Sequence, residues 1–110
     1  MTVAVQISAG QGPAECRLFA AFVHRTILQE ASDAGFDAKE DKMTRADVGL
    51  KSAMIVLDAA LERVRPLNWE GTWQWICKSP LRPHHGRRNW FIAVSIQEEV
   101  EKALHEKEAI

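Results

Sequence analysis

Residues 13–34 have the apolar spacing of one long helix, and this feature constrains the fold most. Their apolar side chains recur at intervals of three and four positions: Leu18, Phe19, Phe22, Val23, Ile27 and Ala31. Pro13 at the first helical position, Glu15 in the first turn and Gly35 after the last turn are typical start and stop signals. The spacing predicts a helix with one apolar stripe, which a second layer of structure must cover.

Strands are predicted on both sides of this helix. Val3, Val5 and Ile7 alternate with smaller or polar residues, which is the period-two pattern of a strand with one buried face. A weakly alternating, polar edge strand, a buried strand and two strands rich in aromatic or β-branched residues are predicted at residues 36–42, 52–58, 72–77 and 91–96. Residues 43–47 are interpreted as a turn or a short helical segment.

Two shorter helices complete the predicted elements. Residues 59–65 are mostly helix formers, with Asp58 as the expected cap and Pro66 as the residue that ends the helix. The Glu-rich stretch 97–108 has one apolar seam and predicts a terminal helix. The order of elements predicts an α+β fold, a mostly antiparallel sheet of about four to five strands with the long helix packed on one face.

The composition fits one globular domain. The chain has 110 residues, of which 46% are hydrophobic and 26% charged. It has no apolar run long enough to span a membrane and no signal-peptide pattern, so an intracellular, cytoplasmic protein is expected. Cys16 and Cys77 match no metal-binding spacing and are expected to be reduced thiols, partly buried.

Positive charge is concentrated in residues 78–91, KSPLRPHHGRRNWF. Residues 71–96 hold four basic residues and no acidic one, whereas the rest of the chain holds ten basic and fifteen acidic residues. Such a stretch can neutralise phosphates, and Pro80 and Pro83 stiffen it. Trp73 and Trp75 are interpreted as core residues, and Trp90 as a residue that stacks on a nucleobase. The predicted RNA-binding residues are Lys78, Ser79, Pro80, Leu81, Arg82, His84, His85, Arg87, Arg88, Asn89 and Trp90.

Chemical alternatives for this stretch have weaker support. His84 and His85 with Cys77 lack a fourth ligand at a usual zinc spacing, so no metal and no other cofactor is predicted. Ser79 near His84 is the weak candidate for a nucleophile and its base, in a protein that would then be a small hydrolase. Residues 8–13 lack the lysine of a phosphate-binding loop and are interpreted as a tight strand-to-helix turn. No catalytic residue is predicted.

Three segments together resemble a known family. They are SAGQGPAECRL at 8–18, LKSAMIVLDA at 50–59 and GTWQWICKSPLRPHHGRRNWF at 71–91. In order and spacing they resemble the N-terminal part of bacterial release factor H, a homologue of class I peptide chain release factors. The resemblance implies a decoding-type domain over residues 1–96, with residues 97–110 as a C-terminal Glu-rich helix of the same domain.

The resemblance also implies a function. In release factors the corresponding loop carries a Ser-Pro-Phe-type tripeptide and enters the decoding centre of the small ribosomal subunit, and Ser79-Pro80-Leu81 stands at that position. The family's codon readers follow it with a histidine and a threonine around Gly-Arg-Arg, whereas this chain has Gly86 to Trp90, so both codon-facing residue types are replaced. The resemblance therefore implies ribosomal RNA binding in termination or ribosome rescue, with a functional link to an RNA ligase.

The hydrolytic motif of the family is not found in these residues. Release factors hydrolyse peptidyl-tRNA with a Gly-Gly-Gln tripeptide in a domain beyond the equivalent of Ile96, and Gly10-Gln11-Gly12 has the wrong order and place. Hydrolysis by this chain alone is not expected. The alternative is a protein-interaction subunit, whose Glu-rich end docks a separate chain that bears the Gly-Gly-Gln domain.

Overall fold

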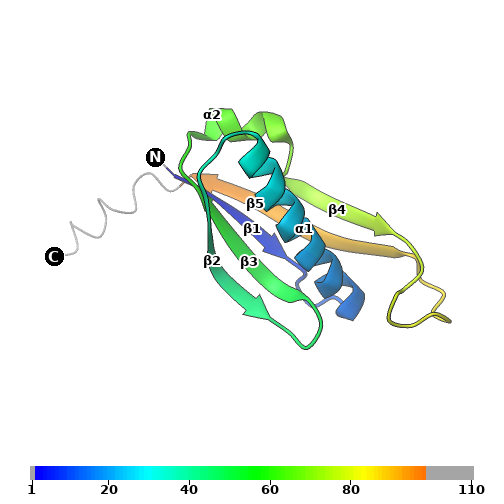
Figure 1. Cartoon of the computed structure of the whole chain (residues 1–110). Coiled ribbons are helices and arrows are strands. Elements are labelled where there is room, and N and C mark those ends of the chain that lie inside the picture. Colours follow the sequence, from blue (N-terminus) through cyan, green and yellow to red (C-terminus); the bar gives the residue numbers. More distant parts are fainter. Residues whose placement is uncertain (1, 99–110) are drawn as a thin grey trace.

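The computed structural model describes residues 2–98 and has an α+β fold. A five-stranded antiparallel sheet carries one long helix, α1 (Ala14–Asp33), across one face (Figure 1). The predicted fold class is confirmed. The expected helix at 97–108 lies outside the described residues, except that residues 97 and 98 belong to the last strand.

The strands follow one another in the order β2-β3-β1-β5-β4 across the sheet. Their bounds are β1 Val3–Ser8, β2 Ala38–Arg45, β3 Leu50–Leu57, β4 Gly71–Ile76 and β5 Asn89–Glu98. Between β3 and β4 the chain forms a one-turn helix, α2 (Leu61–Val64), and a 3₁₀ turn, η1 (Arg65–Leu67). The first strand therefore lies in the middle of the sheet, and the two edges are β2 and β4.

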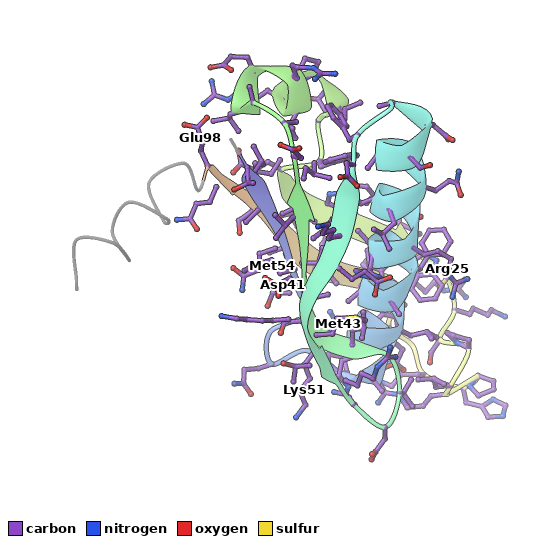
Figure 2. All side chains as sticks on the ribbon, turned by 60° about the vertical axis from the view of Figure 1, so that its left-hand side comes forward. Arg25, Asp41, Met43, Lys51, Met54 and Glu98 are labelled. Atoms are coloured by element: carbon purple, nitrogen blue, oxygen red, sulfur yellow. The ribbon has the colours of Figure 1, made fainter. Side chains whose placement is uncertain are left out.

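The core lies between α1 and the facing side of the sheet. Val3, Val5 and Ile7 of β1 are fully buried, as the alternation predicted. Their neighbours on β3 and β5 continue the same layer, and the opposite face of the sheet, which carries Met54 and Lys51, is turned away from α1 (Figure 2).

The buried stripe of α1 differs from the predicted one by a rotation of the helix. Phe22 was expected in the stripe but is 61% exposed, and Leu18 is only half-buried. Phe19, Val23, Ile27 and Ala31 are buried as predicted. Ala20 lies on the buried side as well, where its small side chain lets the helix axis approach the sheet closely. After the last turn, Gly35 adopts φ +82° and donates its N–H to the carbonyl of Ser32, which confirms it as the helix stop.

Two local predictions between α1 and β4 need correction. Residues 43–47 were expected to be a turn or a short helical segment, but β2 continues to Arg45, and of these residues only 46 and 47 lie in the turn. A bulge after Glu40 brings Met43 opposite Ala53 on the core side. Asp58 was expected to cap a helix over 59–65. It donates its backbone N–H to Asp37 instead, and the helix begins only at Leu61, after an extended residue at position 60 and without a side-chain cap.

The two cysteines and the lengths of the helices were also the subject of predictions. Cys16 is buried and Cys77 half-buried, and both are free thiols, as expected. Among the helices of residues 2–98, none has the length and apolar character needed to cross a membrane.

Candidate functional site

The basic stretch forms a long loop between β4 and β5, residues 77–88, which we call the 77–88 loop. β4 and β5 pair antiparallel up to Ile76 and Asn89, and the Cys77 N–H donates to the Arg88 carbonyl at 2.9 Å, which closes the base of the loop. The predicted hairpin is therefore confirmed. The loop projects beyond the N-terminal end of α1 (Figure 1).

A buried carboxylate holds the loop against the helix. Glu15, in the first turn of α1, is completely buried. Its Oε2 accepts the Ser79 hydroxyl at 2.5 Å and the Arg82 Nε–H at 2.6 Å, and its Oε1 accepts the Arg82 Nη2–H at 2.8 Å. This two-pronged geometry is the strongest form of an arginine–carboxylate pair, so it fixes one point of the loop relative to α1.

Ser79 organises the turn that follows it. Its hydroxyl oxygen accepts the backbone N–H groups of Leu81 at 3.1 Å and Arg82 at 2.9 Å while its proton goes to Glu15. The side chain is 3% exposed. Because the hydroxyl is engaged in these three bonds, Ser79 lacks the hydrogen bond to His84 that a nucleophile and its base would need.

The charge of Glu15 is strongly favoured by its partners. The hydrogen bond from Arg82 lowers the pKa of Glu15 to about 2, with a further contribution from Ser79, although burial acts in the opposite direction. The same bond raises the pKa of Arg82. Glu15 is therefore ionised at neutral pH and neutralises Arg82. This arginine fixes the conformation of the loop but adds no net positive charge to its surface.

Trp90 does not have the predicted role. It was expected to stack on a nucleobase, but it is 0% exposed and donates its indole N–H to the Cys77 carbonyl at 3.1 Å. The Arg87 guanidinium lies 4.8 Å from the centroid of its ring, and the His85 ring lies 6.0 Å away. Trp90 is thus a buried support on which two loop side chains rest.

Arg87 is held in place on this support. Its Nε–H donates to the Asn89 carbonyl at 2.8 Å, and its backbone N–H donates to Nδ1 of His85 at 3.1 Å. The first of these bonds engages the Nε–H of the guanidinium, the second fixes the backbone, and the residue remains exposed. Its Nη groups, which make no hydrogen bond within residues 2–98, are available for an anion.

The predicted site residues fall into three groups. Ser79, Arg82 and Trp90 make the internal contacts that shape the loop. Asn89 lies at the start of β5, where its side-chain oxygen accepts from Gln74 at 2.8 Å. The other seven predicted residues are exposed: Lys78, Pro80, Leu81, His84, His85, Arg87 and Arg88. In the described part of the chain, Lys78, Arg87 and Arg88 form no ion pair with a carboxylate.

Sequence reasoning missed Glu15 as part of the site. It was interpreted only as a favourable residue in the first turn of a helix. The available signal was indirect: the loop contains an arginine among prolines and no acid of its own, so a fixed conformation needed a carboxylate from elsewhere in the chain.

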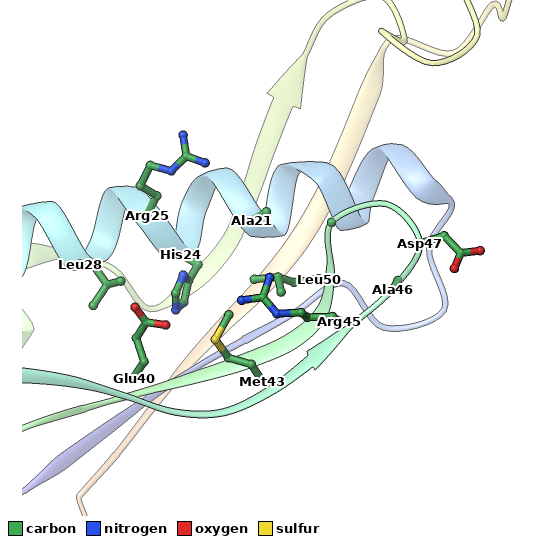
Figure 3. Close-up of a pocket in the computed structure, with 11 residues that line it drawn as sticks. Ala21, His24, Arg25, Leu28, Glu40, Met43, Arg45, Ala46, Asp47 and Leu50 are labelled. Atoms are coloured by element: carbon green, nitrogen blue, oxygen red, sulfur yellow. The ribbon is translucent and has the colours of Figure 1, made fainter.

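A groove lies beside α1, on the side of the helix that faces β2. It has a volume of about 490 Å³ and is lined by His24, Glu40, Met43 and Arg45 (Figure 3). His24 is 6% exposed, and its Nε2 has no hydrogen-bond partner within the described residues. Burial lowers the pKa of His24, Glu40 opposes this shift and Arg45 adds to it. The groove shares no residue with the 77–88 loop.

The fold occurs in a solved structure that is named RF2. The structure matches RF2 of Thermus thermophilus with a TM-score of 0.80, over 94% of this chain and 30% of that one, at 22% sequence identity. At this level of identity the match shows the fold.

Sequence comparison identifies the relatives. The chain is 39% identical over 94 residues to a peptide chain release factor homolog of Escherichia coli, a match that covers 84% of this chain and 46% of that protein. The chain thus spans about half the length of this relative. No family model matches. The resemblance seen in the sequence is confirmed: the chain is a relative of the peptide chain release factors.

Proposed function

We propose that this domain binds ribosomal RNA through the exposed cations of the 77–88 loop, in the decoding site of the small subunit, as part of translation termination or ribosome rescue. The observation that carries the proposal is the arrangement of charge. Lys78, Arg87 and Arg88 are exposed and unpaired within residues 2–98, on a loop that Glu15 fixes from below. A fixed cationic loop loses less conformational entropy on binding than a flexible one does.

The binding surface is smaller than the sequence suggested. Arg82 is paired with Glu15 and Trp90 is buried, so neither supplies a free cation or a stacking surface. The contact with RNA would then be mainly electrostatic, from three cationic residues, with His84 and Leu81 beside them. Leu81 is 41% exposed and is the apolar side chain that the loop offers to a base.

The proposal assigns binding, and not hydrolysis, to this chain. No Gly-Gly-Gln tripeptide occurs in its 110 residues. Hydrolysis of peptidyl-tRNA would therefore be supplied by a further domain or a separate chain that carries this motif. A functional link to an RNA ligase is an implication of the family resemblance alone.

Replacing Arg87 or Arg88 with alanine should weaken binding to isolated small ribosomal subunits. Each change removes one phosphate-neutralising charge, so affinity should fall by about fivefold or more and the slope of log affinity against log salt should decrease by about one. Filter binding at several salt concentrations measures both quantities.

Arg65→Ala is the matched control. Arg65 is an exposed arginine in η1, at the opposite end of the molecule from the loop (Figure 1), so its loss changes the net charge equally. The control should retain wild-type affinity. If Arg65→Ala weakens binding as much as the loop variants do, the attraction depends on overall charge and the loop is not the interface.

A further inference from the structure

The two edges of the sheet differ in how well they are protected against pairing with another strand. β2 reads AKEDKMTR, with five charged residues among eight and two register shifts against β3. Charges and bulges of this kind prevent an edge strand from pairing with a partner. β4 reads GTWQWI, without a charge, a proline or a register shift against β5. In the part of the chain that the structure describes, β4 is therefore the unprotected edge.

The backbone groups that β4 presents at this edge can be assigned. In an antiparallel pair, directly opposite residues alternate between exchanging hydrogen bonds with each other and pointing away. The backbone N–H of Cys77 donates to the carbonyl of Arg88, so the backbone N–H and C=O groups of Trp75 and Trp73 also point toward β5. The N–H and C=O groups of the three intervening residues therefore point outward: Thr72, Gln74 and Ile76. On β5, the Ile96 N–H points toward the β4 side of the sheet and donates to the Glu70 carboxylate. This agrees with the assigned alternation of inward and outward backbone groups.

A small apolar pocket adjoins this edge on the α1 side. It has a volume of about 260 Å³ and is lined by Leu18, Ala21, Phe22, Arg25 and Trp75. Phe22, which was predicted to lie in the core, is 61% exposed and forms one wall of this pocket. Trp75, stacked on Phe19 with centroids 5.5 Å apart, forms a firm floor.

Arg25 adds a charge to the rim. It is exposed, borders both this pocket and the groove between α1 and β2, and makes no ion pair within residues 2–98. In Figure 2 its side chain points away from β2. On the opposite face of the strand, Ile76 is 70% exposed. Side chains of an added strand would face these two surfaces alternately, because successive residues of a strand point to opposite faces.

We propose that β4 is the docking edge for an extended peptide segment of a protein partner. The peptide would pair with the outward backbone groups of Thr72, Gln74 and Ile76, place one large apolar side chain in the pocket beside Phe22, and bring a carboxylate to Arg25. Backbone pairing supplies affinity in this mode of recognition, and the pocket and the charge supply specificity. The site shares no residue with the exposed cations of the 77–88 loop, although Ile76 is only two positions from Lys78, and it does not depend on RNA binding.

The test uses seven-residue peptides selected from a phage-displayed library on the immobilised full chain, then synthesised individually. Gln74→Pro removes one outward N–H that the peptide needs, at an edge position where proline is tolerated in a sheet. Gln74→Ala removes the same side chain and keeps the N–H. We expect at least a tenfold loss of peptide affinity in Gln74→Pro, wild-type affinity within about twofold in Gln74→Ala, and an intermediate loss in Arg25→Ala.

Amide hydrogen exchange gives a second measurement. The amides of Thr72, Gln74 and Ile76 should exchange fast in the free protein and become protected when peptide is bound. Arg88→Ala should leave peptide binding unchanged, so failure of this proposal and failure of the RNA proposal are distinguishable. Selection of no binding peptide, or equal binding to Gln74→Pro and Gln74→Ala, would overturn the proposal. Dimerisation of the free chain that Gln74→Pro abolishes would also overturn it, since the occupant would then be a second copy.

Discussion

Replacing Glu15 with alanine should release the 77–88 loop and destabilise the domain by about 2–4 kcal/mol. The change removes three hydrogen bonds to a buried carboxylate, leaves the Ser79 hydroxyl without its acceptor and opens a cavity. Arg82 is 48% exposed and can regain water, which keeps the cost at the lower end for a buried pair. Urea denaturation measures the free energy of unfolding.

The pH dependence of unfolding provides an independent test of this contact. The pKa of Glu15 is lowered from 4.5 to about 2 in the folded state, so its stabilising contribution is complete above about pH 4.5 and is lost as the pH falls toward 2. Glu15→Gln keeps the shape of the side chain and should remove this part of the acid sensitivity. A Glu15→Gln variant with wild-type stability throughout the range from pH 7 to 2 would show that the ion pair does not anchor the loop.

Replacing Gly49 with alanine should destabilise the domain by about 3–5 kcal/mol. Gly49 has φ +71°, and a Cβ there would lie 2.1 Å from the carbonyl oxygen of Arg17 in α1. The turn between β2 and β3 touches the helix backbone at this point, so relief of the clash requires one element to move. Thermal or urea unfolding measures the loss.

Gly10→Ala separates the two causes of that loss. Gly10 has a similar φ of +57°, but nothing lies within 4 Å of the position of its Cβ. This variant should lose only the cost of a left-handed conformation, about 1–2 kcal/mol. Equal losses at Gly10 and Gly49 would contradict close contact between the β2–β3 turn and α1.

Local patterns in the sequence predicted most of the elements. The spacing of apolar residues identified α1 and its end at Gly35, and alternation identified β1 and the two strands that flank the 77–88 loop. Each of these signals arises from residues near one another in the chain, where burial imposes a period of two or of about four. The rotation of α1 was not predicted, because it depends on which side chains let the helix approach the sheet closely.

The site was predicted less well, because its organising contact is long-range. Glu15 and Arg82 are 67 positions apart, and no local pattern indicates such a pair. For Trp90, by contrast, a local signal was present. It is in phase with Ile92 and Val94 of β5, and all three are buried, so alternation already placed it on the core side. Its neighbours Arg88 and Asn89 suggested a surface position instead.

For the proposed RNA binding, the residues of the basic stretch have two different roles. Three of its residues, Ser79, Arg82 and Trp90, fix the loop through contacts with Glu15 and the Cys77 carbonyl. The exposed cations are then presented in a defined geometry. We infer that the affinity for RNA depends directly on the exposed cations and indirectly on Ser79, Arg82 and Trp90, which hold the loop in shape.

Chemical probing of small-subunit ribosomal RNA tests the central claim most directly. Subunits are modified in the absence and presence of saturating wild-type protein, of the Arg87→Ala, Arg88→Ala double variant and of Arg65→Ala. We expect protection of nucleotides in the decoding site by the wild type and by Arg65→Ala, and loss of that protection in the double variant at the same concentration. Protection confined to other parts of the RNA, or decoding-site protection that the double variant retains in full, would contradict the account.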